Sequence, residues 1–155
     1  MALIKKIINA LKIKSLDLII YKLIPENFTC KKIDFDFNLK ISENKSKKIY
    51  LLFDNQDLVH RSVIFKKVGL LKAINNKGYV IGDCFTNINY RGKGIYPKML
   101  NLIGQDYLNN EINLFIVVDR KNLSSIKGIE KSGFSFHKNL KTKRFLNFFM
   151  NKKIS

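Results

Sequence analysis

A chain of 155 residues, 46% of them apolar, is long enough to bury the core of one domain. Its 29 Lys and Arg against 12 Asp and Glu give a net charge of +17, which indicates a polyanionic partner unless a genome-wide bias towards Lys, Ile and Asn contributes to it. The two cysteines, Cys30 and Cys84, form no paired motif, which argues against a disulfide framework or a structural zinc site, so no metal is expected.

The first 25 residues are predicted to form an amphipathic helical segment. One apolar stripe at helical spacing comprises Leu3, Ile4, Ile7, Ile8 and Leu11, and a second comprises Leu16, Ile19, Ile20 and Leu23. Lysines and Asp17 interrupt both stripes, so neither predicts a transmembrane span, and a secretory signal fits poorly. Two interpretations stay open, a helical pair packed in the core and an amphipathic surface that touches an anionic membrane.

Further apolar runs predict a sheet. Strands are expected at residues 28–41, 49–53, 58–65, 78–86, 112–118 and 145–150. A hairpin turn should join the second and third of these, 112–118 should be central, and 145–150 should be buried. Cys84 is expected to be a small buried side chain rather than a reactive thiol, and His137 to lie at the surface.

A basic loop with two glycines follows the run 78–86 and precedes an amphipathic helix. It reads Tyr90-Arg91-Gly92-Lys93-Gly94-Ile95-Tyr96-Pro97. Glycines let the backbone approach a ligand and adopt positive φ, while the following helix adds unpaired N–H groups and its dipole. A phosphate is therefore the expected ligand, although a plain surface turn gives the same short pattern. Neither the dinucleotide pattern nor the nucleoside triphosphate loop fits.

A second motif runs from Asn122 to Phe134, where Asn122 and Ser125 open a predicted helix and Gly133 closes it. The two motifs, with room for one helix and one strand between them, resemble the GNAT family, the Gcn5-related N-acetyltransferases that use acetyl-coenzyme A (acetyl-CoA). The resemblance implies an α/β (α+β) fold with a mixed, mostly antiparallel central sheet flanked by helices. One acetyltransferase domain would then cover residues 1–155, with the helical segment at 1–25 and the sheet and coenzyme-binding core at 26–155.

The resemblance also implies which residues hold the coenzyme. Backbone N–H groups from Gly92 to Tyr96 would face the pyrophosphate, with Pro97 at the first helical position, and the strand before the loop would run beside pantetheine. The implied coenzyme-binding set is Cys84, Phe85, Thr86, Arg91, Gly92, Lys93, Gly94, Ile95, Tyr96, Asn122 and Ser125. Lys93, Lys98, Lys127 and Lys131 could meet further phosphates as point charges. For Asn122, helix capping alone is the alternative.

The catalytic residues are less clearly marked. Many family members carry a tyrosine that protonates the departing thiolate, and this chain has Ile129 in that place. Tyr96 and Tyr90 are candidate replacements, with packing against the coenzyme as the alternative. His60 and Asp83 are candidate bases for the attacking amine, because both lie on strands expected near the thioester and an ordinary His has a pKa near about 6.5. A structural role is the alternative for both.

The sequence thus predicts an acetyl-CoA-dependent N-acetyltransferase that acts by direct attack of an amine in a ternary complex. Similarity to members encoded with surface-polysaccharide genes, carried by the loop and by Val59-His60-Arg61-Ser62, points to an amino sugar or nucleotide-linked amino sugar as acceptor. An RNA-linked or protein amine, and a non-catalytic coenzyme-binding or membrane-docking module, are the alternatives. Further expected partners are an anionic membrane through residues 1–24 and a second copy of the chain, and nucleic acid is not excluded. The expected location is the cytoplasm, including the inner face of the membrane.

Overall fold

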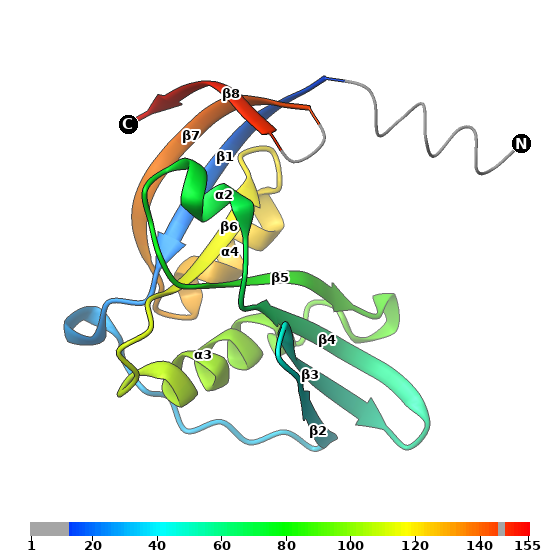
Figure 1. The fold of residues 1–155 in the computed structure, drawn as a ribbon. Coiled ribbons are helices and arrows are strands. Elements are labelled where there is room, and N and C mark those ends of the chain that lie inside the picture. The colour runs from blue at the N-terminus through cyan, green and yellow to red at the C-terminus, as the bar shows by residue number, and fades with distance from the viewer. Residues whose placement is uncertain (1–12, 146–147) are drawn as a thin grey trace, which may run out of the picture.

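The computed structural model describes residues 13–145 and 148–155, which form one twisted eight-stranded sheet with helices on both faces (Figure 1). The strands are β1 (Lys14–Lys22), β2 (Asn38–Glu43), β3 (Lys47–Asp54), β4 (Asp57–Phe65), β5 (Tyr79–Thr86), β6 (Leu114–Asp119), β7 (Ser135–Phe145) and β8 (Phe148–Ile154). The helices are α2 (Gly69–Ala73), α3 (Ile95–Tyr107) and α4 (Leu123–Lys131), with 3-10 turns η1 (Pro25–Asn27) and η2 (Ile88–Tyr90). The sheet order is β2-β3-β4-β5-β6-β1-β7-β8. This mixed, mostly antiparallel architecture confirms the predicted fold class.

Among the strands of residues 13–145 and 148–155, one pairing is parallel; it joins β5 to β6 and is short. It covers three residue pairs, from Tyr79 opposite Leu114 to Ile81 opposite Ile116. Beyond Ile81, β5 continues along β4 as far as Thr86, whereas β6 continues along β1 as far as Asp119. The two strands therefore separate towards their C-terminal ends, and the sheet opens between them.

The helices divide between the two faces of the sheet. One core cluster joins α3 and α4 to the sheet and includes Tyr50, Leu52, Ile81, Met99, Ile103 and Ile129. The other joins α2 to the opposite face and includes Leu18, Ile20, Leu71, Val80 and Leu140. In α3 the buried residues recur at helical spacing, which is why the amphipathic pattern predicted this helix correctly.

The predicted helix over the second apolar stripe is wrong, because residues 14–22 form β1. Leu18 and Ile20 join the cluster under α2, whereas Ile19 and Tyr21 join the cluster under α3 and α4. A strand between β6 and β7 is buried on both faces, so its apolar residues are consecutive and a short run of that kind fits a helix equally well. The first stripe lies outside the described residues. Among the described residues, none of the helices has the length and hydropathy of a transmembrane span.

The predicted strand at residues 28–41 is wrong over most of its length, because only Asn38 onwards pairs with β3. Residues 29–31 instead run beside α3, and side chains of α3 form hydrogen bonds with their backbone N–H and carbonyl groups. Asn101, which is fully buried, accepts from the Lys31 N–H at 3.0 Å and donates to the Thr29 and Ser132 carbonyls at 3.0 and 2.9 Å. With their polar groups held this way, these residues do not join the ladder.

The C-terminal part also differs from the prediction. Residues 145–150 are not one buried strand, because β7 ends at Phe145, β8 begins at Phe148 and the Phe148 side chain is 70% exposed. His137 is half-buried rather than at the surface, with its ring 5.6 Å from that of Phe115. The hairpin of β3 and β4, by contrast, is confirmed, with Asn55 at positive φ in its turn.

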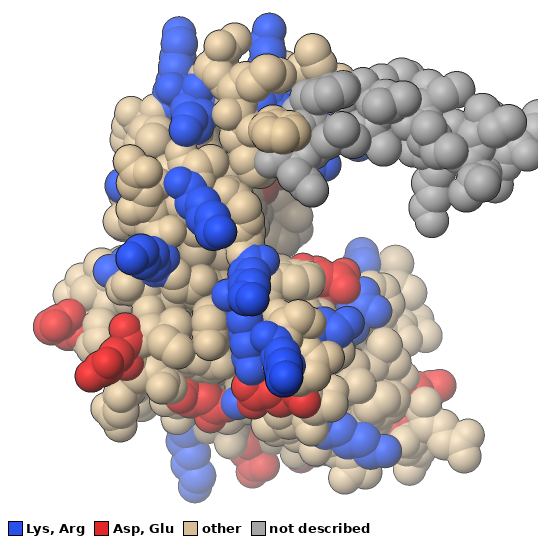
Figure 2. All heavy atoms as spheres, viewed as in Figure 1, with Lys and Arg blue, Asp and Glu red and all other residues tan. Residues whose placement is uncertain are grey.

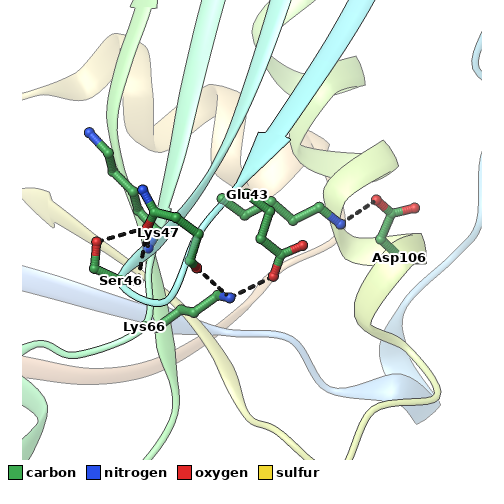
Figure 3. A network of polar contacts seen from close by, with 7 residues as sticks. Glu43, Ser46, Lys47, Lys66 and Asp106 are labelled. Carbon is green, nitrogen blue, oxygen red and sulfur yellow. Dashed lines mark hydrogen bonds and ion pairs between the residues drawn. The ribbon is translucent and has the colours of Figure 1, made fainter.

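A polar network fastens the β2–β3 turn to β4 and to α3 (Figure 3). The Lys66 ammonium lies 2.6 Å from the Glu43 carboxylate and 2.8 Å from the Asn44 carbonyl oxygen. Asp106, near the end of α3, accepts a hydrogen bond from the buried Tyr50 hydroxyl at 2.7 Å and lies 3.7 Å from Lys48. Burial, and then the bond to Asp106, raises the Tyr50 pKa far above its usual range. Tyr50 is therefore a neutral donor that fixes α3 on β3.

We predict that Asn101→Ala lowers the free energy of unfolding by roughly 2 kcal/mol, because the substitution leaves the buried Ser132 carbonyl and two backbone groups of residues 29–31 without their partner. Urea unfolding of the wild type and the variant measures this difference in the free energy of unfolding. Asn110→Ala is the matched control, since its exposed side chain donates one bond to the Asp106 carbonyl and should cost less than about 0.5 kcal/mol. Equal effects in the two variants would contradict the anchoring role of Asn101.

Candidate functional site

A bulge interrupts β5 where that strand leaves β6. Val63 lies opposite Gly82 and Arg61 opposite Phe85, so the single residue Ser62 faces two residues of β5. One of them, Asp83, has φ of 47°, in the left-handed region. A bulge leaves the extra residue outside the hydrogen-bond ladder and turns neighbouring groups in a new direction. Backbone groups of β5 thus become available beside the opening in the sheet.

The glycine-bearing loop connects this strand to α3. Gly92 and Gly94 have φ of 79° and 71°, in the left-handed region that favours glycine. This backbone conformation, and not lack of space, explains their identity, since a Cβ on either would meet no other atom within 4 Å. The Arg91 Nε–H donates to the Thr86 carbonyl at 3.0 Å and holds the loop against β5. The expected helix start at Pro97 is wrong, since α3 begins at Ile95. Pro97 still lies in the first turn, where N–H groups have no intrahelical partner, so its ring costs no hydrogen bond.

A cavity of about 500 Å³ lies between the N-terminal ends of α3 and α4. Its lining residues are Cys84, Thr86, Tyr90, Arg91, Gly92, Gly94, Ile95, Tyr96, Pro97, Asn122, Ser124, Ser125, Lys127, Gly128 and Lys131. Asn122 caps α4, because its side-chain oxygen accepts from the Ser125 N–H at 3.2 Å and from the Ser124 hydroxyl at 3.1 Å. Two helix N-termini and three cationic side chains therefore face one cavity, an arrangement that favours an anionic ligand.

Most of the predicted ligand-binding residues meet here. Phe85 and Lys93 do not line the cavity: Phe85 is 41% exposed, and the Lys93 ammonium lies over the Tyr90 ring at 5.0 Å from its centroid. Cys84 was expected to be buried, yet it is exposed at the cavity wall. Among residues missed as ligand contacts, Ser124 and Gly128 could have been found from their spacing of four on α4, which puts both on one helix face.

Tyr96 lies against α4 because residue 128 is a glycine. A Cβ at Gly128 would come within 2.5 Å of the Tyr96 ring, so no other residue fits without displacing it. Burial raises the Tyr96 pKa well above its usual range, and the neighbouring Cys84 raises it further. The phenol therefore stays protonated near the start of α3. Ile129, which follows Gly128, is fully buried in the core, so its side chain does not reach the cavity.

His60 does not line the cavity but lies behind it, fully buried, in a chain of hydrogen bonds. Its Nδ1 is 2.8 Å from the Thr86 hydroxyl oxygen and its Nε2 is 2.8 Å from the Ser62 hydroxyl oxygen. The Ser62 hydroxyl donates to the Cys84 sulfur at 3.4 Å, so the Ser62 oxygen is free to accept from Nε2–H and Nδ1 to accept from Thr86. The chain begins and ends at residues that line the cavity, Thr86 and Cys84.

His60 and Cys84, the titrating groups of this hydrogen-bonded chain, are neutral near pH 7. Burial lowers the His60 pKa to about 4, so the imidazole is uncharged. Protein packed around its sulfur raises the pKa of the Cys84 thiol to about 11, against the opposing effect of the Ser62 hydrogen bond, even though part of the residue is exposed to the cavity. A neutral imidazole between two hydroxyl groups can pass a proton from one to the other without holding a charge.

Asp83, the other candidate base, is paired elsewhere. Its carboxylate accepts from the Arg61 guanidinium at 2.9 Å, and the residue does not line the cavity. Both side chains of this pair are more than one-third exposed. The structure therefore brings neither His60 nor Asp83 into direct contact with the cavity, whereas Tyr96 does line it.

Known structures share this fold. An acetyltransferase of the GNAT family from Colwellia psychrerythraea aligns with a TM-score of 0.60 at 11% identity, over 86% of this chain and 57% of that one. A conserved protein of unknown function from Staphylococcus epidermidis ATCC 12228 aligns with a TM-score of 0.56 at 12% identity, over 88% of this chain and 63% of that one. The chain thus spans less than two-thirds of either solved chain. No family model and no curated protein matches it. The fold is therefore GNAT-like.

We predict that acid destabilises the wild type more steeply than His60→Gln between about pH 7 and pH 4. Burial lowers the folded-state pKa of His60 below its unfolded value, so the unfolded chain binds the extra proton first and stability falls as pH falls. This contribution should reach roughly 3 kcal/mol below about pH 4. Urea unfolding of both proteins at each pH measures the difference, and parallel pH profiles would show that His60 is not held neutral.

Proposed function

We propose that the protein transfers an acetyl group from acetyl-CoA to an amine. The observation that carries the proposal is the cavity at which the glycine-bearing loop and the N-terminal ends of α3 and α4 meet beside the bulged strand β5. Its donors suit a pyrophosphate, because backbone N–H groups at helix starts and nearby cations all favour negative charge. The GNAT-like fold supports the same ligand, since the Colwellia psychrerythraea neighbour is an acetyltransferase of that family.

Different residues of the cavity would hold different parts of the coenzyme. The N–H groups from Gly92 to Tyr96 would hold the pyrophosphate, and Lys127 and Lys131 would meet further phosphate charge. Asn122 would bond the coenzyme arm through the amide N–H₂, because its oxygen already caps α4. The bulged backbone at Cys84 would offer an N–H group to the thioester carbonyl, where negative charge develops during the attack. No metal is required for this chemistry, and the described residues contain no cluster of metal ligands.

The acceptor we propose first is an amino sugar or a nucleotide-linked amino sugar in the cytoplasm. The net charge of +17 supports a phosphate-bearing acceptor, because it attracts anions to the protein. An RNA-linked amine and a protein amine carry the same reactive group. The three are separated by the acceptor panel described below.

Acetyl transfer moves one proton from nitrogen to sulfur. The amine nitrogen bonds to the carbonyl carbon, the carbon–sulfur bond breaks, the nitrogen loses a proton and the thiolate gains one. Ile129 cannot supply that proton, and Asp83 is held by Arg61. The residues left at the cavity with exchangeable protons on β5 and α3 are Thr86, Cys84 and Tyr96.

We assign the proton transfer to the hydrogen-bonded chain through His60. Thr86 would accept the amine proton and pass its own to His60 Nδ1, while Nε2 passes a proton to Ser62 and Ser62 passes one to Cys84. The Cys84 thiol would then release its proton to the coenzyme thiolate, and water would reset the chain after product release. Each group gains and loses one proton, so no charge collects on the buried imidazole, in keeping with its lowered pKa. Tyr96, beside Cys84, is the alternative donor to the thiolate.

We predict that acetyl-CoA stabilises the protein by roughly 2.7 kcal/mol at about 100 times its dissociation constant, measured by thermal unfolding. Lys127→Ala combined with Lys131→Ala should weaken coenzyme binding about tenfold, because phosphate contacts are lost. Lys40→Ala, on the exposed strand β2, is the control and should bind like the wild type. A thiol-release assay then screens amino sugars, nucleotide-linked amino sugars, aminoacyl-tRNA and lysine peptides.

Two results would contradict the proposal in different ways. An unchanged melting temperature at millimolar coenzyme would exclude coenzyme binding. Stabilisation without thiol release on any amine would indicate a non-catalytic coenzyme-binding module.

We predict that His60→Gln lowers kcat between about tenfold and a hundredfold while leaving the coenzyme dissociation constant unchanged, because Gln bridges two hydroxyls but cannot relay a proton. Ser62→Ala should have the same effect, and the double variant should be no slower than either single one, since both break one chain. Thr86→Ser, which keeps the hydroxyl, should retain activity that Thr86→Val loses. Multiplicative losses in the double variant would exclude a shared chain and leave Tyr96, tested by Tyr96→Phe, as the acid.

A further inference from the structure

One corner of the sheet, away from the cavity lining, combines positive charge with exposed apolar side chains. It is formed by the start of β1 and by the hairpin of β7 and β8. The register places Lys14 opposite Arg144, and Arg144 opposite Phe149, so three strands meet at this corner. Figure 1 shows the blue strand β1 beside the orange β7, which pairs on its other side with the red β8.

The three strands carry an unusual excess of positive charge. The cations of the three strands are Lys14, Lys22, Lys138, Lys141, Lys143, Arg144, Lys152 and Lys153, and their only acidic residue is Asp17. The register places Lys14, Lys143 and Arg144 at the corner itself. Asp17 is already neutralised, because its carboxylate lies 2.9 Å from Arg120 and 3.6 Å from Lys141. The chain as a whole has 29 cations to 12 acids, a far smaller ratio. Figure 2 shows Lys and Arg side chains over this upper part of the molecule.

The same corner exposes large apolar side chains. Phe148 is 70% exposed, Ile13 60% and Met150 37%. Phe148 begins β8, Ile13 directly precedes β1, and Met150 lies opposite Lys143. Lys14 directly follows Ile13, Lys143 pairs with Met150, and Arg144 pairs with Phe149, the residue after Phe148. Exposed apolar residues surrounded by Lys and Arg match the interface of an anionic bilayer, where the apolar groups enter the acyl region and the cations meet headgroups.

We propose that this corner docks on an anionic lipid surface. Nucleic acid would also be attracted by the charge, but it offers nothing to the aliphatic Ile13 and Met150, whereas a bilayer removes them from water. The sequence that precedes the corner adds Lys5, Lys6 and Lys12 and contains no acidic residue. This proposal narrows the expected membrane contact through residues 1–24, because residues 18–21 are buried in the sheet, whereas Lys14 and Ser15 at the start of β1 are exposed.

Docking at this corner would also fix the orientation of the protein on the membrane. Because β1 runs antiparallel to β6, its start extends beyond the C-terminal end of β6, where Asp119 lies opposite Leu18. The cavity opens at that same end of the sheet, at the start of α4. A protein held by this corner presents its cavity end, rather than its β2 edge, to the membrane.

The test is flotation of the full-length protein with vesicles of phosphatidylcholine alone or with about 30% phosphatidylserine. We expect flotation with the anionic vesicles only, and less of it as salt rises. Lys143→Ala combined with Arg144→Ala should lower partitioning roughly fivefold for each cation removed, and Phe148→Ser about tenfold. Lys40→Ala combined with Lys45→Ala, which removes the same charge from the β2 side, should leave partitioning unchanged. Thermal unfolding of each variant verifies the fold.

Three outcomes would overturn the proposal. Equal flotation with neutral vesicles would remove the role of charge, and equal losses in the β2-side control would show that net charge alone, not this corner, attracts the lipid. A third is absence of vesicle binding together with tight, salt-sensitive binding of a single-stranded RNA probe by the same corner residues, which would assign the surface to nucleic acid. None of these results depends on acetyltransferase activity.

Discussion

The rest of the structure depends on the early end of the parallel pairing between β5 and β6. Three residue pairs hold these strands together, after which each follows a different antiparallel neighbour. Because strands in a sheet stay about 4.8 Å apart only while they are hydrogen-bonded, the two C-terminal ends part. The helices that follow these strands, α3 and α4, therefore start on either side of the opening, and their N-termini face the same cavity. The bulge in β5 lies where that strand leaves β6, and β5 pairs with β4 on both sides of it.

Behind the cavity the protein is closely packed around buried polar side chains, which gives these groups fixed roles. His60 and Ser62 are both fully buried, and each of their polar side-chain atoms has a partner. An unpaired polar group at this depth would cost several kilocalories per mole, so the chain from Thr86 to Cys84 is fixed by the same physics that stabilises the core. Gly128 and Tyr96 close the other wall by direct contact between helices. The candidate site is thus built from packing constraints and not only from the loop that marks it in the sequence.

The sequence predicted local features better than pairings between distant segments. The glycine-bearing loop, α4 with its Asn122 cap and the β3–β4 hairpin are local patterns, in which turn and capping residues carry the signal. The strand β1 was predicted as a helix because an apolar run buried on both faces has no period. Residues 28–37 alternate like a strand, although Asn101 bonds the backbone of Thr29 and Lys31 there. The link from His60 to Thr86 requires the register of β4 against β5, including its bulge, and no local pattern reveals that register.

The central position of β1 has a consequence for synthesis of the chain. This strand leaves the ribosome well before its partners β6 and β7, since its register pairs Lys14 with Arg144 and Lys22 with Phe115. Until both partners have emerged, the consecutive apolar residues Leu18 to Tyr21 have no neighbour to cover them. The sheet therefore closes only after β6 and β7 have been synthesised, through contacts of high sequence separation that form slowly. During this interval the apolar run of β1 stays exposed, next to the lysine-rich residues that precede it in the sequence.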